Sequence, residues 1–195
     1  AQTEGSTTYL SRPMAMEVDG TNIQELRTPQ RNGWSLGYNL YGGSVIDWNT
    51  GKDGHVLMAR GYVPEFTTGT RLAQNEEGLG VDDVDTTNLK IARTERPRAV
   101  NQEFISDGHG HVRVMGYDPQ QTYEGYASGK IRYVYRTKDK TDWLPLNDYD
   151  IRTGEGFNPH RVDPVLNVVY GLQKVNGRLA AFSRSLDGTN SEQVI

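Results

Sequence analysis

The chain carries Gly54-His55-Val56, Gly110-His111-Val112 and Leu166-Asn167-Val168, three short stretches that each begin 56 residues after the one before. Two longer stretches, Val18-Asp19-Gly20-Thr21-Asn22 and Leu186-Asp187-Gly188-Thr189-Asn190, lie 168 residues apart, which is three times the same period. A repeat of this length indicates supersecondary units that cannot bury an apolar face alone and must stack on one another. The sequence therefore predicts a repeat architecture.

Each repeat contains two short β-rich runs on either side of a turn of glycine, aspartate or proline, which is typical of a β-hairpin. The paired runs are residues 44–48 with 56–59, 103–105 with 112–115, and 161–163 with 168–172. A further run follows each hairpin and ends in a polar turn, at residues 81–84, 131–135 and 178–185. About four strands in a unit of some 50 residues is what a β-propeller blade requires.

We therefore predict an all-β protein that forms a partial β-propeller of about three four-stranded blades plus an extra strand. The blade end is expected at residues 1–30 and the three blades at roughly 40–92, 98–143 and 150–195. Residues 191–195 have the character of the beginning of another strand. Because closed propellers usually have four to eight blades, this count predicts a fragment of a larger propeller.

The composition agrees with a turn-rich β protein. Among the 195 residues are 22 glycines, 8 prolines and 35% hydrophobic residues, a balance that suits many turns rather than a helical bundle. With no cysteine, the chain has no disulfide framework, thiolate nucleophile or cysteine zinc site.

The charge and the ends of the chain limit the partners and the compartment. A net charge of −4 with both signs interspersed predicts neither a nucleic-acid partner nor a membrane partner. No apolar run approaches the roughly 20 residues needed to cross a bilayer. The compartment stays open, with the lack of cysteine and the start at Ala1-Gln2-Thr3-Glu4 favouring the periplasm or secretion.

Gly33-Trp34-Ser35-Leu36-Gly37 matches G-x-S-x-G, the nucleophile elbow of α/β-hydrolases. An elbow needs an apolar strand before the serine and a helix after it, whereas residues 27–32 are polar and residues 38–43 are rich in glycine. We therefore interpret the match as a loop between blades. A small serine esterase that uses Ser35 is the less favoured alternative.

Two groups of side chains suggest metal ligands. His109 and His111 would face the same side of a strand, but the glycines beside them favour a solvated hairpin turn. Asp82, Asp83 and Asp85 could suggest calcium, yet they lack the glycine and the distal glutamate of an EF-hand loop. A strand end followed by a turn explains them better, so we predict no metal and no cofactor.

Paired carboxylates are a further candidate. Glu76 with Glu77, or Asp148 with Asp150, could serve a glycosidase only at a particular separation, which the sequence does not give. Surface positions are expected for all four. No catalytic residue is predicted from these pairs.

The loop 62–80 is the one apparent insertion, and its part at residues 64–80 holds Glu65, Arg71, Glu76 and Glu77. Such a loop can contact a partner or simply be solvated, and the sequence favours neither.

The large aromatic side chains are expected to pack between blades rather than to stack on a ligand. They include Trp34, Trp48, Trp143, Tyr41 and Tyr133.

Four stretches, taken in their order and spacing, resemble the N-terminal β-propeller of bacterial serine peptidases of the prolyl oligopeptidase family, which includes dipeptidyl and acylaminoacyl peptidases. They are Gly42-Gly43-Ser44-Val45-Ile46-Asp47-Trp48, Gly69-Thr70-Arg71-Leu72-Ala73, Asp107-Gly108-His109-Gly110-His111-Val112-Arg113-Val114-Met115 and Gly156-Phe157-Asn158-Pro159. The resemblance covers most of the chain from about Val18 onward. It implies a propeller of seven or eight blades that covers a C-terminal α/β-hydrolase domain and limits substrates to short peptides.

In that family the catalytic serine, aspartate and histidine belong to the hydrolase domain, so the resemblance carries no catalytic residue over to this chain. The leading hypothesis is a non-catalytic propeller segment that limits or positions short peptide substrates for a hydrolase domain of the same full-length protein. The alternative is a stand-alone, propeller-like scaffold that binds protein partners.

Overall fold

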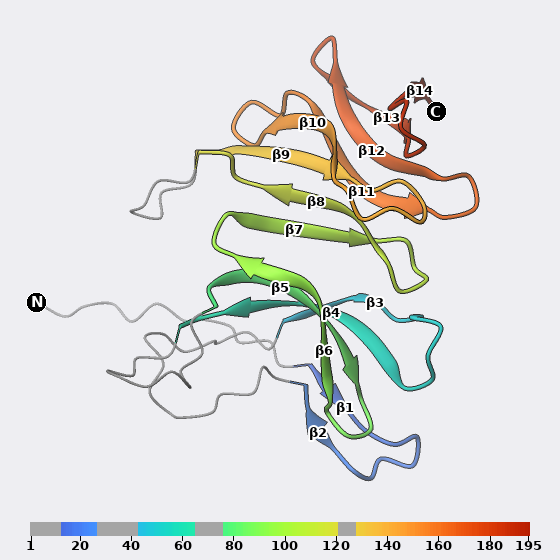
Figure 1. Cartoon of the computed structure of the whole chain (residues 1–195). Helices are drawn as coiled ribbons and strands as arrows, with labels where there is room; N and C mark the ends of the chain where they lie inside the picture. Colours follow the sequence, from blue (N-terminus) through green and yellow to red (C-terminus); the bar gives the residue numbers. More distant parts are fainter. Residues whose placement is uncertain (1–12, 27–42, 65–75, 121–127) are drawn as a thin grey trace, which may run out of the picture.

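The computed structural model describes residues 13–26, 43–64, 76–120 and 128–195. These residues form fourteen β-strands and no helix, which confirms the all-β class. The strands make three four-stranded sheets and one two-stranded sheet, all with antiparallel pairing (Figure 1).

The strands follow the chain through the four sheets in order. The β1–β2 ribbon contains β1 (Met14–Ala15) and β2 (Gln24–Glu25). Sheet 1 contains β3 (Ser44–Asp47), β4 (His55–Tyr62), β5 (Gly78–Asp85) and β6 (Ile91–Arg98). Sheet 2 contains β7 (Asn101–Ser106), β8 (Val112–Tyr117), β9 (Lys130–Tyr135) and β10 (Leu144–Asp150). Sheet 3 contains β11 (Phe157–Asp163), β12 (Val168–Val175), β13 (Arg178–Ser185) and β14 (Glu192–Val194).

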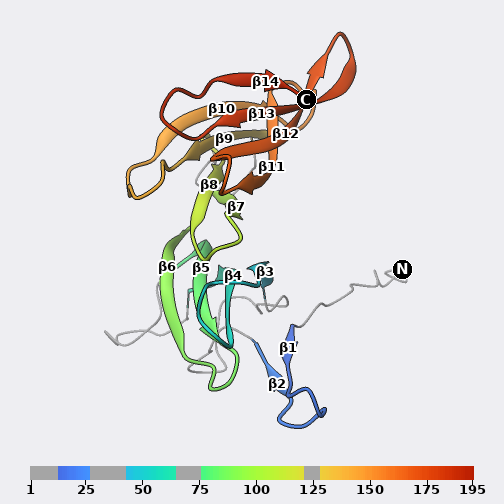
Figure 2. The same cartoon turned by 90° about the vertical axis from the view of Figure 1, so that its right-hand side faces the viewer.

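Each four-stranded sheet is a meander in which strands that follow one another in sequence are also neighbours in space. The sheets are stacked one upon another from the β1–β2 ribbon to sheet 3 (Figures 1 and 2). The first strand of sheet 2, β7, contacts the first strands of the sheets on either side, β3 and β11. Strand β7 also contacts β5, and β10 contacts β11, so each interface involves more than the first strands.

The three predicted hairpins are confirmed because short runs on either side of a tight turn find each other locally. Their registers include Ser44↔Ala59 in β3–β4, Phe104↔Met115 in β7–β8 and Val162↔Val169 in β11–β12. The further run predicted after each hairpin is also a strand, at β5, β9 and β13.

An aspartate closes the first turn of each four-stranded sheet by accepting a hydrogen bond from the backbone N–H two residues on, which is an Asx turn. These bonds are Asn49 N to Asp47, His109 N to Asp107 and Val165 N to Asp163, each 2.9 Å long. The sequence repeat is thus also a repeat of turn chemistry.

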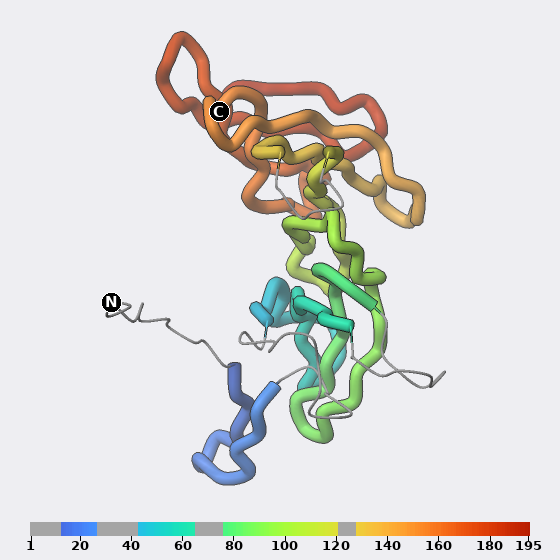
Figure 3. The backbone as a smooth tube through the Cα atoms, turned by 90° about the vertical axis from the view of Figure 1, so that its left-hand side faces the viewer, coloured from blue at the N-terminus to red at the C-terminus, as the bar shows by residue number. Residues whose placement is uncertain are grey.

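A second aspartate turn joins the last two strands of sheets 1 and 3 and the two strands of the ribbon. In each, a threonine two residues on donates its N–H and its hydroxyl to the carboxylate: Thr21 to Asp19, Thr87 to Asp85 and Thr189 to Asp187. The ribbon therefore corresponds to the last two strands of a sheet. The prediction of one extra strand was wrong, since this element has two strands. Figure 3 shows the segment at one end of the described molecule.

Apolar side chains fill three layers between the stacked sheets, and alternation along a strand decides which layer each one enters. In β4, Val56 and Met58 face the ribbon, whereas Leu57 packs with Phe104 and Val112 of sheet 2. The largest layer joins sheets 2 and 3 and contains Ile105, Val114, Tyr133, Tyr135, Leu146, Phe157, Val162, Val169, Phe182 and Leu186.

Several element boundaries differ from those expected. Strand β5 begins at Gly78, so residues 78–80 belong to a strand and not to the loop. Sheet 1 extends to Arg98 and sheet 2 to Asp150, because outer strands with polar side chains give a weak apolar signal. The strand predicted at residues 191–195 is confirmed as β14, which pairs with β13 as the fourth strand of sheet 3.

Candidate functional site

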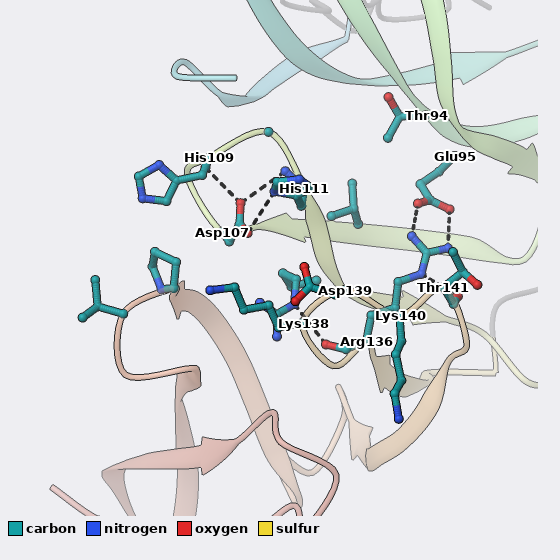
Figure 4. Close-up of a pocket in the computed structure, with 15 residues that line it drawn as sticks. Thr94, Glu95, Asp107, His109, His111, Arg136, Lys138, Asp139, Lys140 and Thr141 are labelled. Carbon is teal, nitrogen blue, oxygen red and sulfur yellow. Dashed lines mark hydrogen bonds and ion pairs between the residues drawn. The ribbon is translucent and has the colours of Figure 1, made fainter. Parts of the chain in front are cut away.

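A cavity of about 840 Å³, which we call the inter-sheet pocket, lies where one end of sheet 2 meets its two neighbours (Figure 4). Its walls come from β6 of sheet 1, from the β7–β8 and β9–β10 turns of sheet 2, and from the β11–β12 turn of sheet 3. The lining consists of Thr94, Glu95, Asp107, residues 109–113, Arg136, residues 138–141, Pro164 and Val165. Cavities of this size are typical of sites for small ligands.

Asp107 organises the turn that carries the two histidines. Its buried carboxylate accepts the N–H of His109 at 2.9 Å and the N–H of His111 at 3.2 Å. Its other oxygen lies 3.3 Å from His111 Nδ1, and the His111 side chain remains 74% exposed. The histidines thus lie in a solvated turn, as expected. Among the described residues, no cluster of three or more His, Cys, Asp or Glu side chains could hold a metal ion.

Arg113 is the buried cation of the pocket, with an exposure of 5%. It is the extra residue of a β-bulge, because β7 and β8 shift register between the pairs Ile105↔Val114 and Ser106↔Val112. A bulge re-aims a side chain, and this one turns a charged group inward where the repeat otherwise places an apolar residue.

The guanidinium of Arg113 has only neutral hydrogen-bond acceptors. Its Nε donates to the carbonyl of Arg136 at 3.0 Å and its Nη2 to Asn167 Oδ1 at 2.7 Å. Burial lowers the pKa of Arg113, while the charges of Asp107 and Asp139 oppose that shift. No carboxylate in the described part of the chain lies within ion-pair distance of it. Arg113 is therefore a buried cation without direct charge compensation.

Arg136 forms the wall of the pocket next to sheet 1. Its guanidinium pairs with both oxygens of Glu95, and it lies 3.9 Å from the centroid of the Trp143 ring. Its Nε donates to the carbonyl of Thr141 at 2.9 Å. Arg136 is thus fully engaged in joining sheets 1 and 2.

The β9–β10 turn adds Lys138, Asp139 and Lys140, all of which are exposed. None of their side chains has a hydrogen-bond or ion-pair partner in the described ranges. In Figure 4, Lys138 extends below the turn of His109 and His111, whereas Lys140 points away from it. The lining holds four arginines and lysines against three acidic residues, in a chain whose net charge is −4.

The three aspartates considered as calcium ligands do not converge. Asp82 is fully buried and accepts hydrogen bonds from Arg93 Nε at 2.8 Å and from the Tyr62 hydroxyl. Burial and the bond to Asp82 raise the pKa of Tyr62 above its usual value. Asp85 closes the turn after β5 as expected.

Asp83 faces the opposite side of β5 from Asp82. It accepts hydrogen bonds from Lys52 Nζ at 2.6 Å and from His55 Nδ1 at 2.7 Å. Burial raises the pKa of Asp83, but the bonds from Lys52 and His55 outweigh burial and leave that pKa below its usual value. Asp82 and Asp83 therefore serve separate ion pairs inside a strand, rather than a strand end as expected.

The other paired carboxylates are also engaged separately. Glu76 binds Arg93 with both oxygens at 2.8 Å, and Asp148 binds Arg132 at 2.8 and 3.0 Å. The side chains of Glu76 and Asp148 are 45% and 56% exposed, which confirms the surface positions expected for them. Asp150 caps the turn after β10.

The aromatic predictions have mixed outcomes. Tyr133 lies in the layer between sheets 2 and 3, and Trp143 packs in the layer between sheets 1 and 2, which confirms both. The prediction for Trp48 was wrong, because its side chain is 78% exposed. Trp48 follows β3 and lines a second cavity of about 780 Å³ beside the ribbon, where only two strands cover sheet 1. Trp34 and Tyr41 lie outside the described residues.

Ser35 and residues 65–75 also lie outside the described residues, so the esterase alternative and the role of the insertion stay predictions. In the part of the chain that the structure describes, no helix has the length and apolar character to cross a membrane.

Arg113, Arg136 and Lys138 were not predicted as site residues. A signal for Arg113 was available: the residues one period before and after it are Leu57 and Val169, both buried and apolar. A charged residue at a buried position of a repeat indicates a special role. No such signal marks Lys138, which looks like any lysine in a polar turn.

No family model, no curated protein and no solved structure matches the chain.

Proposed function

We propose that the chain is a segment of the β-propeller of a peptidase of the prolyl oligopeptidase family, and that it limits or positions short peptides for a hydrolase domain of the same protein. In this proposal the segment supplies no catalytic residue. The observation that carries it is the succession of three stacked four-stranded antiparallel meanders, since a β-propeller is built from repeated four-stranded sheets.

The β1–β2 ribbon supports the same interpretation. Its Asp19–Thr21 turn repeats the turns at Asp85 and Asp187, which join the last two strands of sheets 1 and 3. A ribbon of this kind is the outer half of a further blade. The four stretches that resemble the family include the β7–β8 hairpin, whose Asp107 turn forms part of the inter-sheet pocket.

The proposal is tested on the product of the natural gene and on the 195-residue chain in parallel. We expect the natural product to contain a hydrolase domain with its own G-x-S-x-G elbow and to react with a fluorophosphonate probe. The 195-residue chain should not react, and Ser35→Ala should change nothing in either protein. A natural product without a hydrolase domain would contradict the proposal, and labelling that Ser35→Ala abolishes would establish the esterase alternative.

A stand-alone binding scaffold is the second candidate, and the inter-sheet pocket favours it because the pocket presents cations without partners. Under this alternative the natural product ends without a hydrolase domain and forms a stable complex with a separate protein. Chemical cross-linking in the native source, followed by mass spectrometry, distinguishes the two candidates.

A further inference from the structure

We propose that the inter-sheet pocket binds an acidic peptide segment through the carboxylate of an aspartate or glutamate side chain. This inference does not rest on the proposed function, because it concerns only residues of this chain and requires no hydrolase domain.

Several hydrogen-bond donors in the pocket are unused. Arg113 Nη1 and Lys138 Nζ have no partner within the described residues, and the His109 ring has none either. Only the backbone N–H of His109 is used, by Asp107. Unused cationic donors that line one cavity favour a ligand that brings acceptors and negative charge, because charge-assisted hydrogen bonds are the strong ones.

The pocket's own carboxylates satisfy few of these donors. Glu95 is occupied by Arg136, and Asp107 is occupied by two backbone N–H groups and by His111. Asp139 is the one lining carboxylate in the described ranges without a hydrogen bond or an ion pair. The lining carries four positive charges, from Arg113, Arg136, Lys138 and Lys140, and three negative charges, from Glu95, Asp107 and Asp139, which leaves a net charge of +1.

The size and the lining of the cavity favour a peptide over a simple anion. The cavity of about 840 Å³ falls in the range of sites that hold whole small ligands, so a lone carboxylate or phosphate would leave most of it empty. Pro164 and Val165 supply an apolar wall, and Val165 is 88% exposed. The cationic side chains of Arg113 and Lys138, beside this apolar wall, suit a peptide in which an acidic residue is flanked by apolar residues.

The test measures binding of a fluorescein-labelled hexapeptide of alternating glutamate and valine to the 195-residue chain by fluorescence anisotropy. The matched probe replaces each glutamate by glutamine. We expect the glutamate peptide to bind at least tenfold more tightly than the glutamine peptide at low ionic strength. Equal affinities, or no binding of either peptide, would overturn the proposal.

Two lysine variants locate the site. Lys138→Gln should weaken binding of the glutamate peptide by at least fivefold. Lys140→Gln removes the same charge from the same turn. Because the Lys140 side chain points away from the turn of His109 and His111, the affinity of this variant for the glutamate peptide should stay within twofold of that of the unchanged protein. Equal losses in both variants would show attraction by overall charge only and would overturn the site. Both lysines are exposed, so neither change should affect folding.

Competition with inorganic phosphate separates the two kinds of ligand. We expect 5 mM phosphate, at constant ionic strength, to displace less than a fifth of the bound glutamate peptide. Complete displacement would show a site for a simple anion and would overturn the assignment to a peptide.

Discussion

The two interfaces of sheet 2 differ in chemistry. Towards sheet 3 it meets a continuous apolar layer in which Phe157 and Tyr133 are 0% and 1% exposed. Towards sheet 1 the buried apolar cluster is smaller, and polar contacts add to it: Arg136 pairs with Glu95, and the Ser106 hydroxyl donates to the carbonyl of Ile46 at 3.0 Å. Hydrogen bonds also cross towards sheet 3, such as Asn147 Nδ2 to the carbonyl of Phe157. The two interfaces therefore differ in the larger apolar layer on one face and the Arg136–Glu95 ion pair on the other.

This difference explains where the pocket lies. Apolar layers pack to the density of organic crystals and leave few voids, and the pocket accordingly meets sheet 3 only at the β11–β12 turn, outside the apolar layer. Between sheets 1 and 2 the Arg136–Glu95 pair holds the sheets together near their ends, beside the inter-sheet pocket. This ion pair thus forms one wall of the candidate site, and the β11–β12 turn of sheet 3 forms another.

The largest expected effect is at the apolar interface. Phe157→Ala removes a fully buried ring and should lower the free energy of unfolding by about 3–5 kcal/mol. Urea denaturation followed by tryptophan fluorescence measures it. Leu179→Ala is the control, since Leu179 is 68% exposed and should cost less than about 0.5 kcal/mol. Similar costs for both variants would show that the sheet 2–3 layer does not stabilise the protein.

A glycine under an aromatic ring provides the next test. A Cβ on Gly116 would lie 2.7 Å from Tyr133 Cε1 and 2.9 Å from Ile131 Cγ2. Because Tyr133 is fully buried and cannot move freely, Gly116→Ala should lower the free energy of unfolding by about 1–3 kcal/mol. An unchanged denaturation midpoint would show that the ring is loosely packed.

The ion pair between sheets 1 and 2 is tested by a double-mutant cycle of Glu95→Gln and Arg136→Gln. Their side chains are only 11% and 21% exposed, so we expect a coupling free energy of about 1 kcal/mol. The matched control is the cycle of Asp148→Asn and Arg132→Gln, whose side chains are 56% and 46% exposed and should couple by less than about 0.5 kcal/mol. A coupling at Glu95 no larger than the control would remove the structural role of this pair.

The smallest effect concerns the aspartate turns. The hydroxyl and N–H of Thr189 lower the pKa of Asp187 to about 2, and Thr87 lowers the pKa of Asp85. A carboxylate whose pKa is lower in the folded state stabilises the protein above its unfolded pKa, and that stabilisation is lost as the pH falls through the folded pKa. The free energy of unfolding should therefore fall between about pH 4 and pH 2.

Asp187→Asn should remove part of this pH dependence, because an amide does not titrate. Urea midpoints measured at intervals from pH 7 to pH 2 check it. A variant whose stability falls with pH as steeply as that of the unchanged protein would contradict the role of this turn.

Local features of the fold were predictable from the sequence, and long-range ones were not. The hairpins at Asp47, Asp107 and Asp163 depend on turn chemistry between adjacent runs, which the sequence displays directly. The exposure of Trp48 depends on how much of sheet 1 the two-stranded ribbon covers, which no local pattern encodes.

The candidate site was predictable only in part. His109 and His111 were identified as candidates. Their place in a pocket, however, depends on Arg113 and on the turn of Lys138, which is far from them in sequence. Arg113 enters the pocket because of a register shift of one residue in the β7–β8 pair. Such a bulge leaves no mark in the alternation of Val112-Arg113-Val114, so only comparison between the repeats could have indicated it.

The contrast between the two interfaces is tested most directly by native-state amide hydrogen exchange in low urea. If the apolar layer is the stable core, amides of β9 and β12 should exchange only through global unfolding, whereas amides of β4 and β5 in sheet 1 should exchange through a partial opening of lower free energy. Protection in sheet 1 equal to or greater than that in sheets 2 and 3 would contradict the account.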